Sequence, residues 1–168
     1  MNPSNQHLLI PKIESGVVID HITAGHGPRI VEIIHAHPGL EKAMVSLGLN
    51  YGSTKQGLKD MVKVHDHPLP AAVLEQIALV SPGVTIKRVE GFEVIERIVL
   101  QPPRTILGMG QCRNPNCVTN TEGAVTTRFV AVDPKALKFR CCFCERVFRL
   151  RDMQFVLPRS AWRKGCPR

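Results

Sequence analysis

Four cysteines stand in two close pairs toward the C-terminal end of the chain. Four residues separate Cys112 from Cys117, two separate Cys141 from Cys144, and twenty-three lie between the pairs. Each pair can close a tight turn, and two facing turns bring four sulfur atoms to the corners of a tetrahedron, the geometry of structural Zn²⁺ sites. Because four thiolates leave no position for water, the spacing predicts one structural zinc ion and no catalytic metal.

Two disulfide bonds are the alternative to a metal ion at these cysteines. Disulfides suit exported chains, but residues 1–10 lack the basic start and apolar block of a secretory signal. The other two thiols complete no disulfide framework, because Cys142 lies between proposed ligands and Cys166 stands alone in a basic tail. We therefore expect bound Zn²⁺ and a cytoplasmic protein.

The composition limits the kind of partner. The chain has 168 residues, 22 of them Lys or Arg against 14 Asp or Glu, for a formal net charge of +8. Such a balance favours polyanions such as nucleotides or nucleic acid, or an acidic protein. No apolar run approaches the length that spans a bilayer, so no membrane partner is expected.

Apolar periodicity predicts an α+β fold for residues 1–100. The expected order is strand, helix, strand, strand, helix, strand, strand, with a turn at residues 50–53. That order is typical of a ferredoxin-like antiparallel sheet with both helices on one face, here with an extra final strand. The expected strands are 17–22, 43–49, 59–64, 84–89 and 92–100, and the expected helices are 29–35 and 70–79.

The cysteines fall in a second, smaller unit. We expect a linker with two prolines at 101–104, a β-rich zinc domain at 105–157 with strands near 126–132 and 138–141, and a basic tail at 158–168. So small a unit buries little apolar surface, whereas binding structural zinc contributes about 10–16 kcal/mol in small peptides. The metal is therefore expected to decide whether this domain folds.

Charged residues gather on the strands predicted for the first domain. Asp20 and His21 end a strand that is otherwise apolar, and Lys59 and Lys63 share one face of another strand. A carboxylate can accept hydrogen bonds from a sugar or a base, and an imidazole can donate to an oxyanion. Taken alone, each feature is better explained as an ordinary strand end or a solvated strand face.

The last two predicted strands of this domain carry Lys87, Arg88 and Arg97. Adjacent cations suit a triphosphate, although charges on an exposed edge also discourage aggregation. The sequence has no Walker loop, no HExxH, no GxSxG and no dinucleotide fingerprint. A binding function is therefore favoured over an enzymatic one.

Several segments gain meaning when they are taken together. The run GVVIDHI at 16–22, GLN at 48–50, Lys59-Asp60 followed by Lys63, and the cysteine spacing resemble the regulatory chain of aspartate carbamoyltransferase from about residue 10 to residue 148. The resemblance implies a non-catalytic regulatory subunit whose first domain binds ATP and CTP and whose zinc domain docks the catalytic chain. It also implies that regulatory chains form dimers through the first domain and that these dimers bridge two catalytic trimers. The complex would act in pyrimidine biosynthesis.

The same resemblance implies roles for individual residues. Asp20 matches a residue that contacts the nucleotide, His21 and Lys63 match residues near the ribose and phosphates, and Lys59 matches one near the phosphate end. Arg97 stands in place of a phosphate-binding lysine. Arginine keeps the charge of a lysine but presents a planar fork, so phosphate binding is expected to survive with altered geometry. The other matched positions are Ile13 and Val94 beside the base pocket, Phe92 in place of a tyrosine, and Lys87 where asparagine is common.

A nucleic-acid-binding zinc-ribbon protein is the competing interpretation of the basic charge and the four cysteines. Only 5% of the residues are aromatic, and the sheet domain has no aromatic pair placed to stack on bases. A zinc enzyme would need an open coordination position, which four thiolates deny. We therefore expect no nucleic-acid partner.

Overall fold

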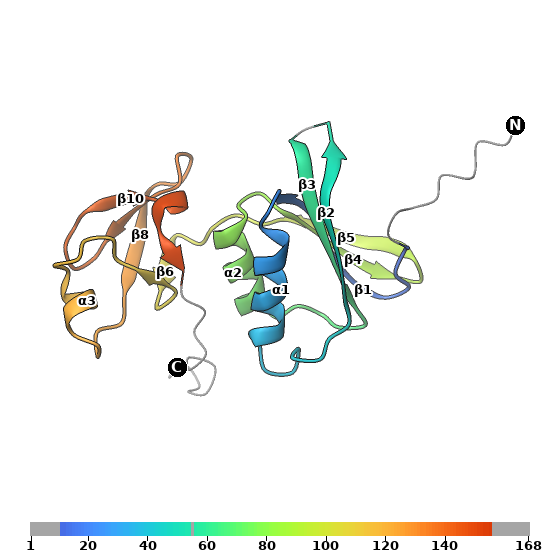
Figure 1. The fold of residues 1–168 in the computed structure, drawn as a ribbon, viewed down its shortest axis with the longest axis horizontal. Helices are drawn as coiled ribbons and strands as arrows, with labels where there is room; N and C mark the ends of the chain where they lie inside the picture. The colour runs from blue at the N-terminus through green and yellow to red at the C-terminus, as the bar shows by residue number, and fades with distance from the viewer. Residues whose placement is uncertain (1–10, 55, 156–168) are drawn as a thin grey trace, which may run out of the picture.

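The computed structural model describes residues 11–54 and 56–155, which fold as two β-sheet domains placed end to end (Figure 1). The first domain contains a five-stranded antiparallel sheet with the order β2-β3-β1-β4-β5. This is the ferredoxin-like order with β5 added at one edge, so the predicted α+β fold is confirmed. The strands are β1 (Gly16–Thr23), β2 (Val45–Ser53), β3 (Gly57–His65), β4 (Thr85–Glu90) and β5 (Glu93–Val99).

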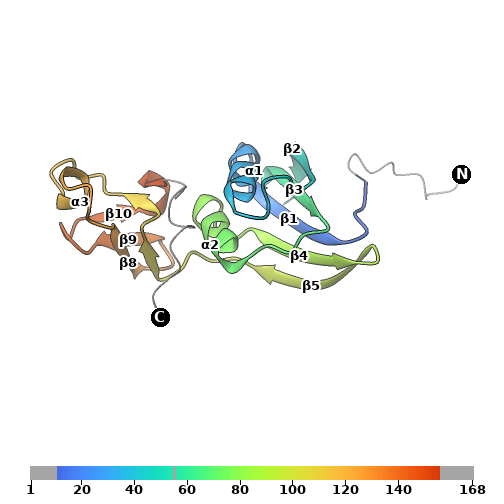
Figure 2. The ribbon, with the colours of Figure 1, turned by 90° about the horizontal axis from the view of Figure 1, so that it is seen from below.

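Two helices cover one face of this sheet, and the opposite face carries no helix (Figure 2). Helix α1 (Gly27–Ala36) has a proline in its first turn, where the fixed φ of proline suits a helix start. Its isoleucines recur on one side, as a half-buried helix requires. With α2 (Ala71–Val80) it packs on β-branched strand residues. The core includes Ile30, Ile33 and Ile34 of α1, Val73 and Ile77 of α2, and Ile19, Ile22, Val62 and Val64 of the sheet.

The predicted turn at residues 50–53 is wrong. Strand β2 continues through these residues, and the chain reverses only between Ser53 and Gly57, which are paired across the hairpin. Asn50 has a φ of 58°, but this left-handed residue lies in a register shift between Gly48 and Tyr51. Turn-forming residues here make a bulge inside a long hairpin, because asparagine tolerates positive φ in either setting.

The second domain is built on a four-stranded antiparallel sheet with the order β10-β9-β8-β6. Its strands are β6 (Thr105–Leu107), β8 (Arg128–Asp133), β9 (Lys138–Cys141) and β10 (Val147–Arg149). The strands predicted near 126–132 and at 138–141 correspond to β8 and β9. Smaller elements complete the domain: β7 (Gly110–Gln111) pairs with β11 (Gln154–Phe155), α3 spans Val118–Thr121 and the 3-10 helix η1 spans Leu150–Asp152.

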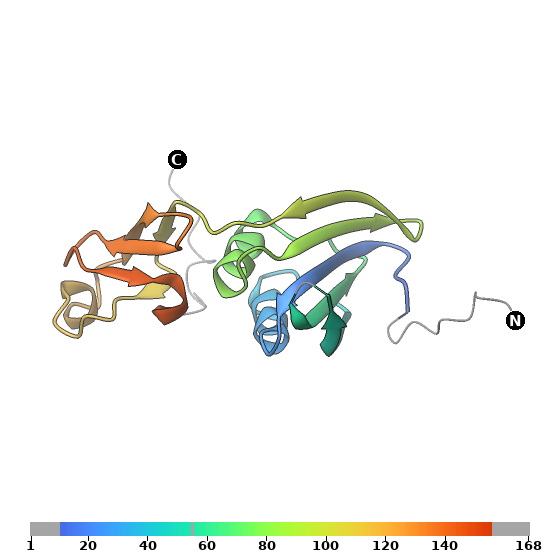
Figure 3. The same ribbon diagram turned by 90° about the horizontal axis from the view of Figure 1, so that it is seen from above.

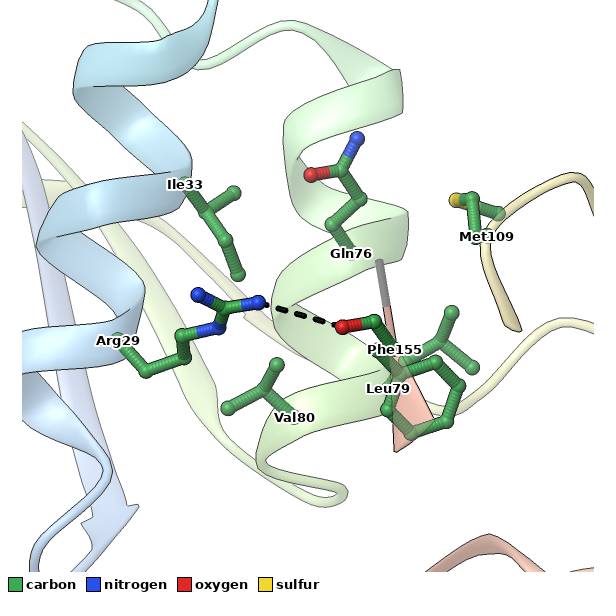
Figure 4. A pocket seen from close by; sticks show the side chains of 7 residues that line it. All are labelled: Arg29, Ile33, Gln76, Leu79, Val80, Met109 and Phe155. Carbon is green, nitrogen blue, oxygen red and sulfur yellow. Dashed lines mark hydrogen bonds between the residues drawn. The ribbon is translucent and has the colours of Figure 1, made fainter. Parts of the chain in front are cut away.

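The two domains meet where α2 faces the second domain. Leu79 of α2 packs into the second domain's core with Ile106, Phe129 and Phe139. Beside it, the guanidinium of Arg29 on α1 donates a hydrogen bond of 3.3 Å to the backbone carbonyl of Phe155 (Figure 4). The β4–β5 hairpin turns at the end of the first domain that is remote from this junction (Figure 3).

Among residues 11–54 and 56–155, no helix has the length and apolar character needed to cross a bilayer. The predicted basic tail at 158–168, with Cys166, lies outside the described residues.

Candidate functional site

Three cations are aligned across the helix-free face of the first sheet. Lys63 on β3 is paired with Val18 on β1, Val18 with Lys87 on β4, and Lys87 with Arg97 on β5. Directly paired residues of antiparallel strands point to the same face, so these side chains form one row. The register thus brings together residues separated by up to 34 positions in the chain.

Asp20 lies beside this row and binds two lysines. Its carboxylate oxygens accept hydrogen bonds of 2.6 Å from Nζ of Lys59 and 2.6 Å from Nζ of Lys87, and one also accepts from the His21 amide at 2.7 Å. The Asp20 side chain is only 5% exposed. Burial alone raises the pKa of this carboxyl, but the hydrogen bonds from Lys59, Lys87 and the His21 amide hold it well below its usual range.

A bulge in β1 gives this corner its shape. The register of β1 with β3 shifts between Ile19 and Ile22, and His21 has a φ of 61°. The Nδ1 atom of His21 lies 3.7 Å from the Asp20 carboxylate. One extra residue in the strand therefore places an imidazole and a carboxylate side by side.

Lys63 is mostly buried, with 7% of its surface exposed, and donates a hydrogen bond to the backbone carbonyl of Pro11. Burial lowers the pKa of its ammonium group, and the charge of Lys87 lowers it further. Both effects penalise the cation, so a negatively charged ligand near Lys63 would stabilise it.

An apolar cluster adjoins the cations on the same face. Ile13, Val18 and Val89 are buried there, with Met61 packed against them. Val94 is paired with Val89 and is 50% exposed. Of these residues, Val94 presents exposed apolar surface next to the charged row.

The remaining predicted residues are less enclosed. Arg97 is exposed beside Lys87. Phe92 lies in the β4–β5 turn with 53% of its surface exposed and a φ of 65°. Arg88, which the sequence grouped with Lys87, is paired with Glu96 and lies 3.7 Å from the carboxylates of Glu90 and Glu96, on the other face of the hairpin.

Asp60 is a residue whose role sequence reasoning missed. It is fully buried, and its carboxylate accepts hydrogen bonds from the amides of Gly25 at 2.8 Å, Gly27 at 2.9 Å and Asn50 at 3.0 Å. It therefore fixes the start of α1 against β2 and β3. The sequence indicated that Asp60 is buried, because residues two apart on a strand point to the same face and Val62 faces the core.

The four predicted cysteines converge in the second domain. All four sulfur atoms lie within 4.8 Å of one another, with 3.6 Å between Cys112 and Cys144 and 3.9 Å between Cys117 and Cys141. Thiolates bound at about 2.3 Å around a tetrahedral zinc lie about 3.8 Å apart. The cluster therefore fits a four-coordinate metal, whereas disulfide sulfurs would be bonded at about 2.05 Å.

Polar groups hold the first cysteine turn in shape. The amide of Asn120 donates to the carbonyls of Cys112 at 2.7 Å and of Asn114 at 2.8 Å. The Thr119 hydroxyl lies 3.2 Å from the Cys117 sulfur. Such outer contacts orient ligating side chains and tune a bound metal.

The thiol pKa values differ within the cluster. Burial raises the pKa of Cys112 and of Cys141. Burial also opposes ionisation of Cys144, but the Arg146 amide and the Asn114 side chain outweigh it, and the pKa of Cys144 falls to about 7. Thiolates are the ligating form, so metal binding here would release protons.

Comparison with known proteins assigns the family. One family model, described as the allosteric domain of the aspartate carbamoyltransferase regulatory chain, matches residues 8–101, and a second, its metal binding domain, matches residues 104–154. The chain belongs to the family of aspartate carbamoyltransferase regulatory chains.

Relatives with this name match nearly end to end. The regulatory chain of Thermofilum pendens is 40% identical over 154 residues, which cover 90% of this chain and 96% of the relative. That of Pyrococcus abyssi is 40% identical over 146 residues, covering 87% and 95%. That of Thermoplasma acidophilum is 34% identical over 146 residues, covering 87% and 96%.

Family membership makes this regulatory chain a non-catalytic subunit with an allosteric domain and a metal-binding domain. A regulatory chain implies a complex with a catalytic chain. The helix-free face lies in the first domain and the cysteine cluster in the second, so the two candidate sites fall in different domains.

Proposed function

We propose that this regulatory chain binds ATP and CTP on the helix-free face of its first sheet and adjusts the activity of a catalytic chain in pyrimidine biosynthesis. The observation that carries the proposal is the row of Lys63, Lys87 and Arg97 next to a buried carboxylate. Three cations on one sheet face, with an apolar cluster beside them, match the two chemically different ends of a nucleotide.

Each part of the face has a role in this proposal. Lys63 and Arg97 neutralise the phosphates, and the fork of Arg97 can bind two phosphate oxygens at once. Asp20 accepts hydrogen bonds from the sugar or base, with His21 and Lys59 beside it near the phosphates. The apolar contact with the base comes from Ile13 and Val94, while Phe92 and Lys87 are the positions that influence the choice of base.

The Asp20 carboxylate competes with a bound nucleotide for two lysines. Its carboxylate occupies Lys59 and Lys87. A triphosphate that attracts these lysines competes with Asp20, and the released carboxylate becomes available to the nucleotide. Nucleotide binding thereby rearranges contacts among three strands.

A nucleotide acts on the catalytic chain only if it binds one state of the complex better than the other. Couplings of this kind are typically about 1–3 kcal/mol. We propose that ATP and CTP share the site and differ in how their bases fit it, so the base end determines which state each one favours.

We also propose that the metal is zinc, one ion per chain, held by Cys112, Cys117, Cys141 and Cys144 in a structural role. Four cysteine sulfurs at near-tetrahedral spacing favour Zn²⁺ over metals that prefer oxygen ligands. The second domain would then dock the catalytic chain, in the cytoplasmic location expected from the cysteine usage. Metal analysis of the purified chain tests this directly, and a chain without bound metal would contradict it.

We further infer a homodimer through the first domain, with such dimers bridging two catalytic trimers. Both edge strands expose apolar side chains, Leu47 and Leu49 on β2 and Val94, Ile95, Ile98 and Val99 on β5. Strand β2 carries no charged residue, whereas β5 carries Glu96 and Arg97, charges that discourage edge pairing. Leu49→Lys is expected to give monomers in sedimentation analysis, and Ile95→Lys on β5 is the matched control. A dimer unaffected by Leu49→Lys would exclude the β2 edge.

Calorimetry with ATP and CTP tests the nucleotide site. A hydrogen bond to a charged group contributes roughly 1.5–3 kcal/mol, so Lys63→Ala and Arg97→Ala are each expected to weaken both nucleotides about tenfold or more. The affinities of ATP and CTP both fall because both nucleotides carry the triphosphate. Arg88→Ala is the matched control, since this cation neighbours Lys87 on β4 but is paired with Glu96 across the hairpin. Unchanged binding by both Lys63→Ala and Arg97→Ala would place the site elsewhere.

A further inference from the structure

A second group of cations surrounds a pocket in the metal-binding domain. The pocket has a volume of about 310 Å³ and opens where β9 and β10 pair. It is lined by Ala136, Leu137, Lys138, Arg149, Leu150 and Arg151. We propose that this pocket is an anion-binding site that takes a compact ligand with two or more phosphate groups.

Two of these cations are neighbours on adjacent strands although like charges repel each other. Lys138 on β9 and Arg149 on β10 are directly paired across the strands. Like charges in this position repel and destabilise a sheet. A bound anion between them would turn this repulsion into attraction, so the arrangement favours a negatively charged occupant.

Among the described residues, carboxylates do not form ion pairs with these two cations. In the part of the chain that the structure describes, neither Lys138 nor Arg149 has a carboxylate within 4.0 Å. Asp133 is paired with Lys138 from β8, but its carboxylate accepts a 3.0 Å hydrogen bond from the Ala136 amide. Arg151 lies 4.0 Å from Asp152 and its side chain is 73% exposed, so this contact leaves it available.

The charge of the whole domain points the same way. Residues 104–155 contain nine Lys or Arg against four Asp or Glu. Long-range attraction would therefore raise the local concentration of anions around the pocket.

The shape and chemistry of the pocket select the ligand class. Its volume is at the small end of ligand pockets. Two arginines offer planar forks that match phosphate oxygens, and Lys138 adds a point charge. Phe148, the aromatic residue of β10, is paired with Phe139 on the core side of the sheet. Without a stacking partner, a compact phosphate cluster suits the pocket better than a nucleic-acid strand.

Tripolyphosphate added to the full-length, metal-loaded chain is the test. Amide resonances of residues 136–138 and 149–151 are followed by NMR, which separates this pocket from the nucleotide site on the first sheet. We expect saturable shifts at these amides, and about tenfold weaker binding for Arg149→Ala. Lys63→Ala in the first domain is expected to leave the shifts at this pocket unchanged.

Arg128→Ala is the matched control, because Arg128 on β8 is paired with Leu107 of β6 and does not line the pocket. Equal weakening by Arg128→Ala and Arg149→Ala would mean diffuse attraction and would overturn the proposal. An absence of saturable shifts would also overturn it, even if Arg149→Ala impaired assembly with the catalytic chain. Saturation by a DNA oligonucleotide but not by tripolyphosphate would equally reject it in favour of nucleic-acid binding.

Discussion

At the scale of single residues, the Asp20 carboxylate joins three strands across the bulge in β1. It accepts hydrogen bonds from Lys59 on β3 and from Lys87 on β4. The ionised form of Asp20 therefore depends on side chains from both neighbouring strands.

Replacing Lys87 tests the electrostatics of this carboxylate. In Lys87→Met we expect the pKa of Asp20 to rise, because one of its two lysine partners and a nearby positive charge are gone. Carboxyl NMR titration of the wild type and the variant measures the shift. Arg88→Met removes a cation from the neighbouring position of β4 and is expected to leave the pKa of Asp20 unchanged.

The sign of the pH dependence follows from the same shift. A depressed carboxyl pKa contributes stability that is fully present above the ordinary aspartate value near 3.8 and is lost as the pH falls through the folded-state pKa. In Lys87→Met this contribution is expected to be smaller, and its loss is complete at a higher pH, because the folded-state pKa lies closer to the ordinary value. An Asp20 pKa that is the same in wild type and Lys87→Met would show that Lys87 does not stabilise the carboxylate.

The two candidate sites differ in how far the sequence predicted them. The spacing of the cysteines predicted the cluster that the structure contains, because closely spaced pairs form turns by local geometry. The hydrogen bonds of Asp20 join three strands across a bulge. Strand pairing and bulges are tertiary features, so the sequence predicted these charged residues but not their partners.

At the scale of elements, the order of strands and helices in the first domain was predictable. Alternating and helical apolar patterns extend over whole elements there, so local errors average out. The turn expected at 50–53 failed because Asn50 supports a bulge as well as a turn. The two-residue strands β7 and β11 and the four-residue α3 are too short to carry a periodic pattern, so the sequence did not predict them.

Asp60→Ala tests how α1 is attached to the sheet. The substitution leaves three amides without their acceptor inside the protein, at Gly25, Gly27 and Asn50. Because unmatched buried groups are costly, we expect the first domain to lose about 3 kcal/mol or more of unfolding free energy in urea titrations. Asp60→Asn keeps one acceptor and is expected to lose less. Glu75→Ala on the exposed side of α2 is the control, and an equally small effect for Asp60→Ala would rule out this anchoring role.

At the scale of the whole molecule, a continuous set of contacts runs from the helix-free face to the second domain. Lys59 binds Asp20 on that face, and its neighbour Asp60 holds the amide of Gly27 at the start of α1. Two residues further along α1, Arg29 reaches the Phe155 carbonyl of β11 (Figure 4). The sheet, the helix layer and the second domain are thus in direct contact, which gives a physical path for a coupling between domains.

The two domains nevertheless have different sources of stability, and metal removal is expected to separate them. The buried core of the first domain consists of aliphatic residues, mostly from strands β1, β3 and β4 and the two helices, and includes none of the four cysteines. The core of the second includes Cys112, Cys117 and Cys141 themselves.

A mercurial reagent that releases the metal should therefore unfold the second domain, dissociate the catalytic chain and leave ATP binding by the first domain within about twofold. Amide NMR spectra and calorimetry on the treated chain measure both effects. Simultaneous loss of structure in both domains would show that the junction at Leu79 and Arg29 makes them one cooperative unit, and a folded second domain after complete metal release would remove the structural role of the metal.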